Sequence, residues 1–245
     1  MASLAVHLHS LREELGNDFL GTLKRIKDIG FDAVELCDFL EWEDRYRDAL
    51  PEAALTPSSA HVAMVGRDVG PVFDAAERVG VTTLIEPQID RELWTNRIGV
   101  QNSAARMNEI ARIGADRGIT VGYHNHWWEA EYRVDGAPSL AVFVDSLDDE
   151  VVLEVDPFWL EVGGISAANM LAQFGDRVRL IHVKDGSLTR DERDQVAVGS
   201  GNLDFPKILA AAPRAVRVVE LDHFAGNVFE ALQDSYRYLS ASNRA

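Results

Sequence analysis

The sequence predicts a single-domain α/β fold, a (β/α)₈ TIM barrel that covers residues 1–245. Three observations lead to this prediction. Short apolar runs alternate with amphipathic stretches eight times along the chain, as the consecutive βα units of such a barrel do. The runs are apolar on both faces, which is typical of parallel strands that are covered on both sides. The length of the chain also suits one large domain.

Eight apolar runs give the predicted strands. They are residues 4–10, 33–39, 55–64, 82–88, 119–126, 151–159, 178–185 and 216–222, of which the third belongs to the least regular unit. Apolar residues at helical spacing predict helices over 18–30, 102–118, 166–176 and 227–239. A doubly wound open sheet is the alternative fold. It would be expected to carry a Gly-rich phosphate loop after the first strand, and "HLHSLREEL" has none.

Composition and charge exclude several classes of protein. The net charge of −16 would repel a polyanion, so we expect no nucleic-acid partner. No apolar run approaches the ~20 residues of a membrane span, and the start "MASLAVHLHSLREEL" lacks the features of a signal peptide. Cys37 is the single cysteine, which excludes an internal disulfide and is compatible with a reducing compartment. We therefore expect a cytoplasmic protein without a membrane partner.

Histidines gather where a barrel carries its chemistry. All seven, His7, His9, His61, His124, His126, His182 and His223, lie in or just after a predicted strand. Active sites of such barrels lie at the carboxyl ends of the strands. We expect His7 and His61 to line the substrate pocket. For His9 and His223, a purely structural role is the simpler interpretation.

Pairs of polar residues two positions apart share one face of a strand. The pairs are His124 with His126, Glu154 with Asp156, His182 with Lys184, and Glu220 with Asp222. Burying several carboxylates together is unfavourable unless a positive charge neutralises them. Mixed carboxylate and imidazole ligands suit Mn, Co, Fe or Zn better than Ca. Asp156, His182 and Glu220 are therefore candidate metal ligands, with a fourth from the strand at 119–126.

Each of these assignments has a simpler reading. A single strand histidine is often a hydrogen-bonded core residue, and an aspartate at a strand end often caps a helix. Trp127, Trp128 and Trp159 follow strand ends, where they either belong to the core or stack on a sugar ring. The charged run at 41–48 is expected to be a solvated helix or loop.

Several motifs resemble one known family over nearly the whole chain. They are "VHLHSLREEL", "GFDAVEL", "GYHNHWWE", "LEVDPFWLEVGG", "LIHVKDG", "VGSGNLDFPKIL", "VVELD" and "SYRYL". In this order they resemble the sugar phosphate isomerase/epimerase family, the xylose isomerase-like TIM barrels. The "YHNH" variant is most similar to the branch that contains inosose dehydratases and enzymes that eliminate the aglycone from 3-keto-glycosides.

The resemblance implies one divalent metal ion held by Glu, Asp, His and Glu from strands five to eight. Asp156, His182 and Glu220 match three of these ligands, and Lys184 would be a substrate contact. His124 stands where the strand-five carboxylate is expected, so Glu129, five residues later, or His126 is the alternative fourth ligand. The metal would be Mn, Co, Mg, Fe or Zn, with Mn favoured.

The resemblance also implies an enzyme that abstracts a proton next to the carbonyl of a small keto sugar or an inosose. His124 or His126 would be the general base or acid, and Glu220 a second one. Lys184 and His61 would orient the substrate, and Trp127 and Trp159 would contact its ring. The outcome is isomerisation or epimerisation; the alternative is a metal-dependent lyase that eliminates a β-substituent.

Other functions receive less support. The related abasic-site endonucleases hold three zinc ions, and both the charge of −16 and the lack of further ligands argue against that activity. A non-catalytic sugar-binding protein or accessory subunit is a second alternative, although three retained ligands argue against it. A homo-oligomer is compatible with the sequence. The glycines of "VGSGNLDFPKIL" could shape a phosphate pocket, but the few basic residues near strand ends favour an unphosphorylated substrate.

Overall fold

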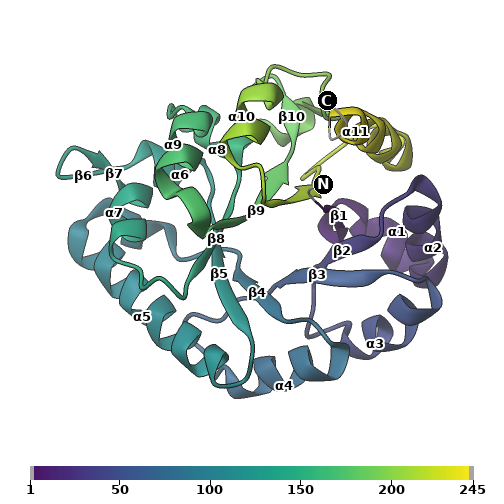
Figure 1. Cartoon of the computed structure of the whole chain (residues 1–245), viewed down its shortest axis with the longest axis horizontal. Coiled ribbons are helices and arrows are strands. Elements are labelled where there is room, and N and C mark those ends of the chain that lie inside the picture. Colours follow the sequence, from purple (N-terminus) through teal and green to yellow (C-terminus); the bar gives the residue numbers. More distant parts are fainter. Residues whose placement is uncertain (1–2, 243–245) are drawn as a thin grey trace.

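A computed structural model describes residues 3–242 of the chain. Eight parallel strands close into a barrel in the order β1-β12-β9-β8-β5-β4-β3-β2, and helices surround it (Figure 1). The strands are β1 (Leu4–His7), β2 (Ala33–Leu36), β3 (Thr56–His61), β4 (Thr83–Glu86), β5 (Thr120–His124), β8 (Val152–Val155), β9 (Val178–Val183) and β12 (Val216–Val219). The predicted single-domain (β/α)₈ barrel is confirmed.

Helices connect consecutive barrel strands. They are α1 (Arg12–Asn17), α2 (Phe19–Ile29), α3 (Glu43–Glu52), α4 (Gly70–Val79), α5 (Arg97–Ala115), α6 (Trp127–Glu131), α7 (Ser139–Asp145), α8 (Pro157–Val162), α9 (Ala167–Phe174), α10 (Phe205–Ala211) and α11 (Val228–Ser242). Short 3₁₀ turns are η1 (Leu8–Leu11), η2 (Arg91–Thr95), η3 (Gly175–Arg177) and η4 (Glu192–Asp194). Two small sheets pair β6 (Arg133–Val134) with β7 (Ala137–Pro138), and β10 (Asp185–Gly186) with β11 (Gln195–Val196).

Capping residues set the helix borders. The Asp18 side chain accepts a hydrogen bond from the Gly21 amide and starts α2. Gly30 ends α2 with a φ of 123° and would clash with Tyr236 if it carried a Cβ, so the position requires glycine. Asn96 caps α5 by accepting from the Gly99 amide. For that reason α5 begins five residues before the predicted helix at 102–118.

All eight strands are shorter than predicted, and after two of them a polar cap starts a helix. The predicted strand at 151–159 ends at Val155, where Asp156 caps α8 and Pro157 occupies its first turn. The predicted strand at 119–126 ends at His124. Directly after these strands, Asp156 is fully buried and His126 is half-buried.

Alternation along the strands separates an apolar barrel floor from a polar mouth. Ala5, Ala33, Ile85, Leu180 and Val218 form a small buried cluster of their own. His7, Glu35, His182 and Glu220 follow four of these residues by two positions, so they share the inward face and lie nearer the carboxyl ends. A larger apolar cluster includes residues from both the strands and the helices. None of the helices in residues 3–242 has the length and apolar character needed to cross a membrane.

Candidate active site

The carboxyl ends of seven barrel strands bring ionisable side chains together. These residues are His7, Glu35, His61, His124, Glu154, His182 and Glu220. All are buried except His61, which is half-buried. Their hydrogen bonds and ring contacts connect them into one cluster at the barrel mouth. Four of the seven histidines of the sequence thus meet in one cluster at the barrel mouth.

His182 lies at the centre of this cluster and faces carboxylates on both sides. Its Nδ1 is 2.7 Å from Glu220 Oε2, and its Nε2 is 2.7 Å from Glu35 Oε1. Nε2 is also 3.2 Å from Glu154 Oε2. Burial lowers the pKa of His182, but the charges of Glu154, Glu220 and Glu35 outweigh burial and raise that pKa well above its ordinary value. The ring is thus held firmly between acidic partners.

His61 and His124 extend the cluster beside Glu154. His61 Nε2 is 2.6 Å from Glu154 Oε2. Burial opposes ionisation of Glu154, yet the positive charges of His182 and His61 lower its pKa well below the ordinary value. The His124 ring lies 4.4 Å from the His182 ring. Burial, followed by the charges of His182 and His61, lowers the pKa of His124 well below its usual range. His124 is therefore a neutral imidazole, the form that binds metals.

Lys184 supplies a cation on the other side of His182. Its Nζ lies 3.1 Å from Asp156 Oδ2, 2.8 Å from Glu220 Oε2 and 2.6 Å from Asp222 Oδ2. Burial lowers the pKa of Lys184, but these carboxylates, with Asp156 first, raise it well above the ordinary value. Burial also raises the pKa of Asp156, although the charge of Lys184 acts against that shift. Three carboxylates therefore converge on one buried positive charge.

The donor atoms of the cluster fit a divalent metal ion. Within residues 3–242, His124 Nδ1, Glu154 Oε1 and Asp156 Oδ2 are buried and accept or donate no hydrogen bond, although Asp156 Oδ2 has its ionic contact with Lys184. Such unpartnered atoms are rare and need an explanation. Candidate ligand atoms of His61, His124, Glu154 and His182 lie within 4.8 Å of one another, as do those of His7, His182 and Glu220. A metal ion would neutralise the excess carboxylates and use the free lone pairs.

Glu129 has a different place from the one expected of a metal ligand. It lies in the first turn of α6, where its Oε2 accepts from the His126 amide at 2.9 Å. Its Oε1 accepts from the Tyr123 hydroxyl at 2.7 Å and lies 3.4 Å from His126 Nδ1. Both oxygens are thus engaged by α6 and β5, since the helix begins directly after His126. Neither Glu129 nor Asp156 belongs to the possible metal-ligand groups among the described residues, but Asp156 Oδ2 is buried and accepts no hydrogen bond.

His126 and Trp159 line the cavity at the barrel mouth, whereas Trp127 does not. The His126 ring stacks on Trp128 at 4.1 Å. Trp159 is buried, and Lys184 Nζ lies 5.3 Å from its ring centroid. Trp127 contacts Arg190 and Arg91 at 3.7 and 4.4 Å. The expected substrate contact from Trp127 therefore finds no support in its position, because the start of α6 places it among surface arginines.

The candidate ligands and contacts chosen from the sequence did not include Glu35 and Glu154. Glu35 is fully buried in β2 and also accepts from the Ser59 hydroxyl at 2.5 Å. The available signal was a single carboxylate inside an apolar strand, two residues before Cys37. Glu154 had been paired with Asp156 on one strand face. The structure shows that both glutamates form the inner part of the cluster, beneath the cavity-lining histidines.

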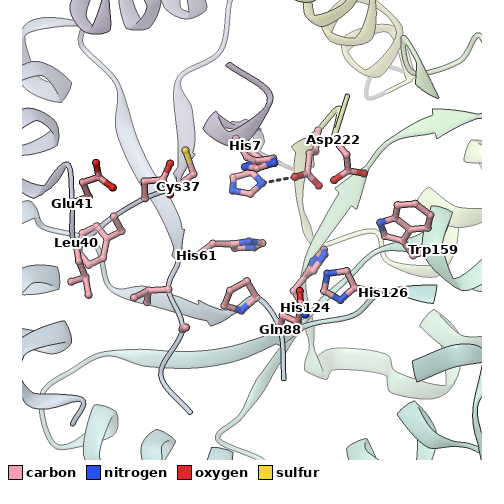
Figure 2. A pocket seen from close by; sticks show the side chains of 17 residues that line it. His7, Cys37, Leu40, Glu41, His61, Gln88, His124, His126, Trp159 and Asp222 are labelled. Atoms are coloured by element: carbon pink, nitrogen blue, oxygen red, sulfur yellow. Dashed lines mark hydrogen bonds and ion pairs between the residues drawn. The ribbon is translucent and has the colours of Figure 1, made fainter. Parts of the chain in front are cut away.

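A cavity of about 490 Å³ opens above the cluster. His7, His61, His124, His126 and Glu220 reach it, together with Trp159 and Asp222. Figure 2 shows Cys37, Leu40 and Glu41 on the side opposite to His126, Trp159 and Asp222. The cavity volume lies within the range of about 300–1,000 Å³ that is usual for small-molecule sites. The polar cluster is therefore accessible to a small substrate.

The glycine-rich loop at 198–204, directly before α10, already holds an anion that belongs to the chain itself. The Asp185 carboxylate accepts from the amides of Gly199, Gly201 and Leu203 at 3.0, 2.8 and 3.2 Å. It also accepts from the Gly186 amide at 2.9 Å. Backbone amides arranged in this way often bind phosphate. Because Asp185 takes these donors, they are not available to a phosphate group of a substrate.

The fold and the site define a parallel β-barrel with a buried histidine and carboxylate cluster at the carboxyl ends of its strands. The sequence profile of the family described as "Xylose isomerase-like TIM barrel" matches residues 67–215. The chain belongs to this family. A search of curated proteins found no match.

Solved structures of similar fold cover nearly the whole chain. A sugar phosphate isomerase/epimerase from Parabacteroides distasonis ATCC 8503 is 22% identical, with a TM-score of 0.86 over 98% of this chain and 94% of its own. The IolI protein with a bound zinc atom is 16% identical, with a TM-score of 0.75 over 99% and 98%. The probable 3-DHS dehydratase AsbF of Bacillus anthracis, involved in petrobactin synthesis, is 13% identical, with a TM-score of 0.74 over 97% and 98%. These likenesses support the fold.

Proposed function

We propose that this protein is a divalent-metal-dependent enzyme that removes a proton next to the carbonyl group of a small keto sugar or an inosose. The observation that carries the proposal is the buried cluster of carboxylates and imidazoles under the cavity, with its unpartnered donor atoms in the described part of the chain. The names of the similar structures, an isomerase/epimerase and a probable dehydratase, are consistent with this chemistry. The zinc atom of IolI is consistent with a metal.

Asp156, His182 and Glu220 are the proposed metal ligands, with His124 as the fourth. Lys184 Nζ lies 3.1 Å from Asp156 Oδ2 and 2.8 Å from Glu220 Oε2, and the same Glu220 oxygen is 2.7 Å from His182 Nδ1. This arrangement supports a site that favours positive charge. On the opposite side of the ring, Nε2 faces Glu35. Metal-bound histidines usually donate their second nitrogen to such an outer carboxylate. Manganese is the favoured ion, and it would polarise the substrate carbonyl and stabilise developing negative charge.

His126 is the proposed general base. Its ring lines the cavity, stacks on Trp128 and has Glu129 Oε1 at 3.4 Å from Nδ1. A carboxylate beside one ring nitrogen fixes the orientation of the other, which then faces the substrate. Glu129 is thus a positioning residue for His126. Glu220, which also reaches the cavity, is the proposed second proton carrier.

Lys184, His7 and His61 are proposed to orient the substrate hydroxyls. His7 and His61 line the cavity, and Lys184 borders it through Asp222 and Glu220. Trp159 offers an aromatic face for the sugar ring. The substrate is proposed to be unphosphorylated, because Asp185 occupies the amide donors of the glycine-rich loop. The single cysteine favours a cytoplasmic location.

Two reactions share this first proton abstraction. Return of the proton to another carbon or another face gives isomerisation or epimerisation, whereas loss of a β-substituent gives the alternative lyase. A sugar-binding accessory subunit without catalysis is the second alternative.

Proton NMR in D₂O tests the proposal with Mn²⁺-loaded protein and a panel of ketohexoses, inososes and 3-keto-glucosides. The metal is removed before acquisition. Deuterium next to the carbonyl with all atoms retained identifies an isomerase or epimerase, and release of water or an aglycone identifies a lyase. Binding of a sugar without any exchange would contradict the catalytic proposal and support the accessory role.

A further inference from the structure

The cavity has an apolar wall that the proposed sugar chemistry does not use. The apolar residues of this wall follow β2, β3 and β4, and they are Cys37, Phe39, Leu40, Val62, Ala63 and Pro87. Asp38, Glu41 and Gln88 of the same segments add polar groups to it. The ionisable residues that line the cavity near Trp159 come from β5, β12 and the segments after them. Figure 2 shows the two sides facing each other across His61. Most of the apolar residues that line the cavity thus lie on one side of it.

Leu40 is the most informative residue of this wall. Among residues 3–242, the exposed large hydrophobic side chains are Leu40, Leu93, Ile98 and Ile113. Leu40 is 37% exposed and lines the cavity, whereas the other three line none of the described cavities. Ligand pockets are lined mainly by apolar and aromatic side chains, so an exposed apolar side chain inside such a cavity is available to contact a ligand.

The segment that carries Leu40 is rigidly built. Asp38 has a φ of 45°, an unfavourable conformation for a residue other than glycine. The Asp38 carbonyl accepts from the amides of Glu41 and Trp42 at 3.0 Å each, and the Tyr46 hydroxyl donates to the Cys37 carbonyl at 2.7 Å. Phe39 is almost fully buried and anchors the turn. Strain of this kind persists where the surrounding structure enforces it, often beside a binding site.

Cys37 adds to the apolar character of the wall. Burial raises the pKa of its thiol to about 12, so the group is uncharged near neutral pH and behaves as a small hydrophobe. The uncharged thiol therefore lies with Phe39 and Leu40 in the apolar part of the wall, beside the polar side chains of Asp38, Glu41 and Gln88.

We propose that the cavity binds a two-part substrate: the sugar ring lies on the histidine side, and an apolar, preferably aromatic, substituent of the sugar lies against Leu40, Phe39 and Pro87. This inference rests on the proposed function, because it assigns the polar side to the sugar. A substituent joined to the ring through oxygen is also the group that an elimination would release. The apolar wall therefore supports the lyase alternative over simple isomerisation of a free sugar.

Saturation-transfer NMR and competition titration with phenyl β-D-glucoside and methyl β-D-glucoside test the subsite. The wild-type protein should bind the phenyl glucoside roughly tenfold more tightly, with saturation on the phenyl protons, since burial of an aromatic ring supplies the difference. Leu40→Ser should remove most of that preference. Leu93→Ser is the matched control, because Leu93 is 39% exposed and lies outside the described cavities, and it should keep the preference.

Equal affinities for the two glucosides, undetectable binding of the phenyl glucoside, or the same result for both serine variants would overturn the inference. The outcome is separable from that of the proposed function. If deuterium exchanges into a keto sugar but the protein binds the phenyl and methyl glucosides equally, the catalytic proposal stands and the subsite is refuted. If Leu40→Ser loses the preference for the phenyl glucoside but the wild type shows no deuterium exchange, the subsite stands and the catalytic proposal fails.

Discussion

Asp156 and Asp185 follow neighbouring barrel strands, and both are fully buried. The Asp185 carboxylate accepts four backbone hydrogen bonds, from Gly186, Gly199, Gly201 and Leu203. Asp156 accepts one, from the Trp159 amide at 2.9 Å, and its Oδ2 has only the contact with Lys184. The Asp185 carboxylate is thus fully paired with backbone amides, whereas Asp156 Oδ2 accepts no hydrogen bond. This difference separates a structural acid from one that is available for chemistry.

The largest expected effect comes from Asp156→Asn. The substitution keeps an oxygen for the Trp159 amide but removes the charge proposed to bind the metal. Activity in the deuterium-exchange assay should fall roughly 10³-fold, as losses of electrostatic stabilisation in active sites do. The free energy of unfolding in urea should change by less than about 1 kcal/mol, because the helix cap remains. Unchanged activity with a large loss of stability would make Asp156 a structural residue.

The same substitution at Asp185 should lower the stability of the fold and leave metal binding unchanged. Asp185→Asn replaces charge-assisted hydrogen bonds with weaker ones and places an NH₂ group against amide donors. We expect the free energy of unfolding to fall by about 2–3 kcal/mol. The metal content of the folded fraction should remain as in the wild type. Urea denaturation and metal analysis of both aspartate variants together decide whether the two roles are distinct.

Gly201 packs closely against the Asp185 carboxylate, and its substitution tests the structural role of that carboxylate. A Cβ there would clash with the Asp185 carboxylate and the Gly186 amide, so Gly201→Ala should lower the free energy of unfolding by about 1–3 kcal/mol. Gly16→Ala is the control. Gly16 lies in α1 with no atom near its would-be Cβ, and alanine should stabilise that helix by about 0.5–1 kcal/mol. Thermal or urea unfolding of both variants measures the difference; equal values would refute the tight packing around Asp185.

Glu129→Gln tests whether Glu129 orients the base or binds the metal. With its oxygens already held by Tyr123 and His126, loss of the charge should lower kcat roughly tenfold through poorer orientation of His126, while KM and metal content stay unchanged. A variant that loses its metal would instead return Glu129 to the ligand set that the sequence first suggested.

The last prediction concerns the reactivity of Cys37 and involves no substitution. Its pKa of about 12 means that the thiol is protonated at pH 8 and gains thiolate only as the pH rises toward 12. Alkylation by iodoacetamide at pH 8 should therefore be at least roughly 100-fold slower in the native protein than in urea. Mass spectrometry of the alkylated chain measures the two rates. Rapid native labelling would show that this side of the cavity is neither buried nor apolar.

Local patterns in the sequence predicted the barrel and much of its mouth. Period-two spacing placed His182, Lys184 and Glu220 at strand ends, since each follows from the apolar run before it. The position of Glu129 depended on where α6 begins, which a cap at His126 decides. Glu35 meets His182 across 147 residues of sequence. That contact requires the closed barrel, so spacing within one strand could not predict it.

Metal titration tests most directly the central claim that Asp156 helps to bind one divalent metal ion. Mn²⁺ is titrated into the wild type, Asp156→Asn and Glu154→Gln, and electron paramagnetic resonance measures the free Mn²⁺. The account predicts one tightly bound ion per wild-type chain, at least roughly 100-fold weaker binding in Asp156→Asn, and near wild-type binding in Glu154→Gln. Loss of binding in Glu154→Gln with retention in Asp156→Asn would move the metal to the inner group of His61, His124, Glu154 and His182. Absence of metal binding in an active wild type would contradict the account.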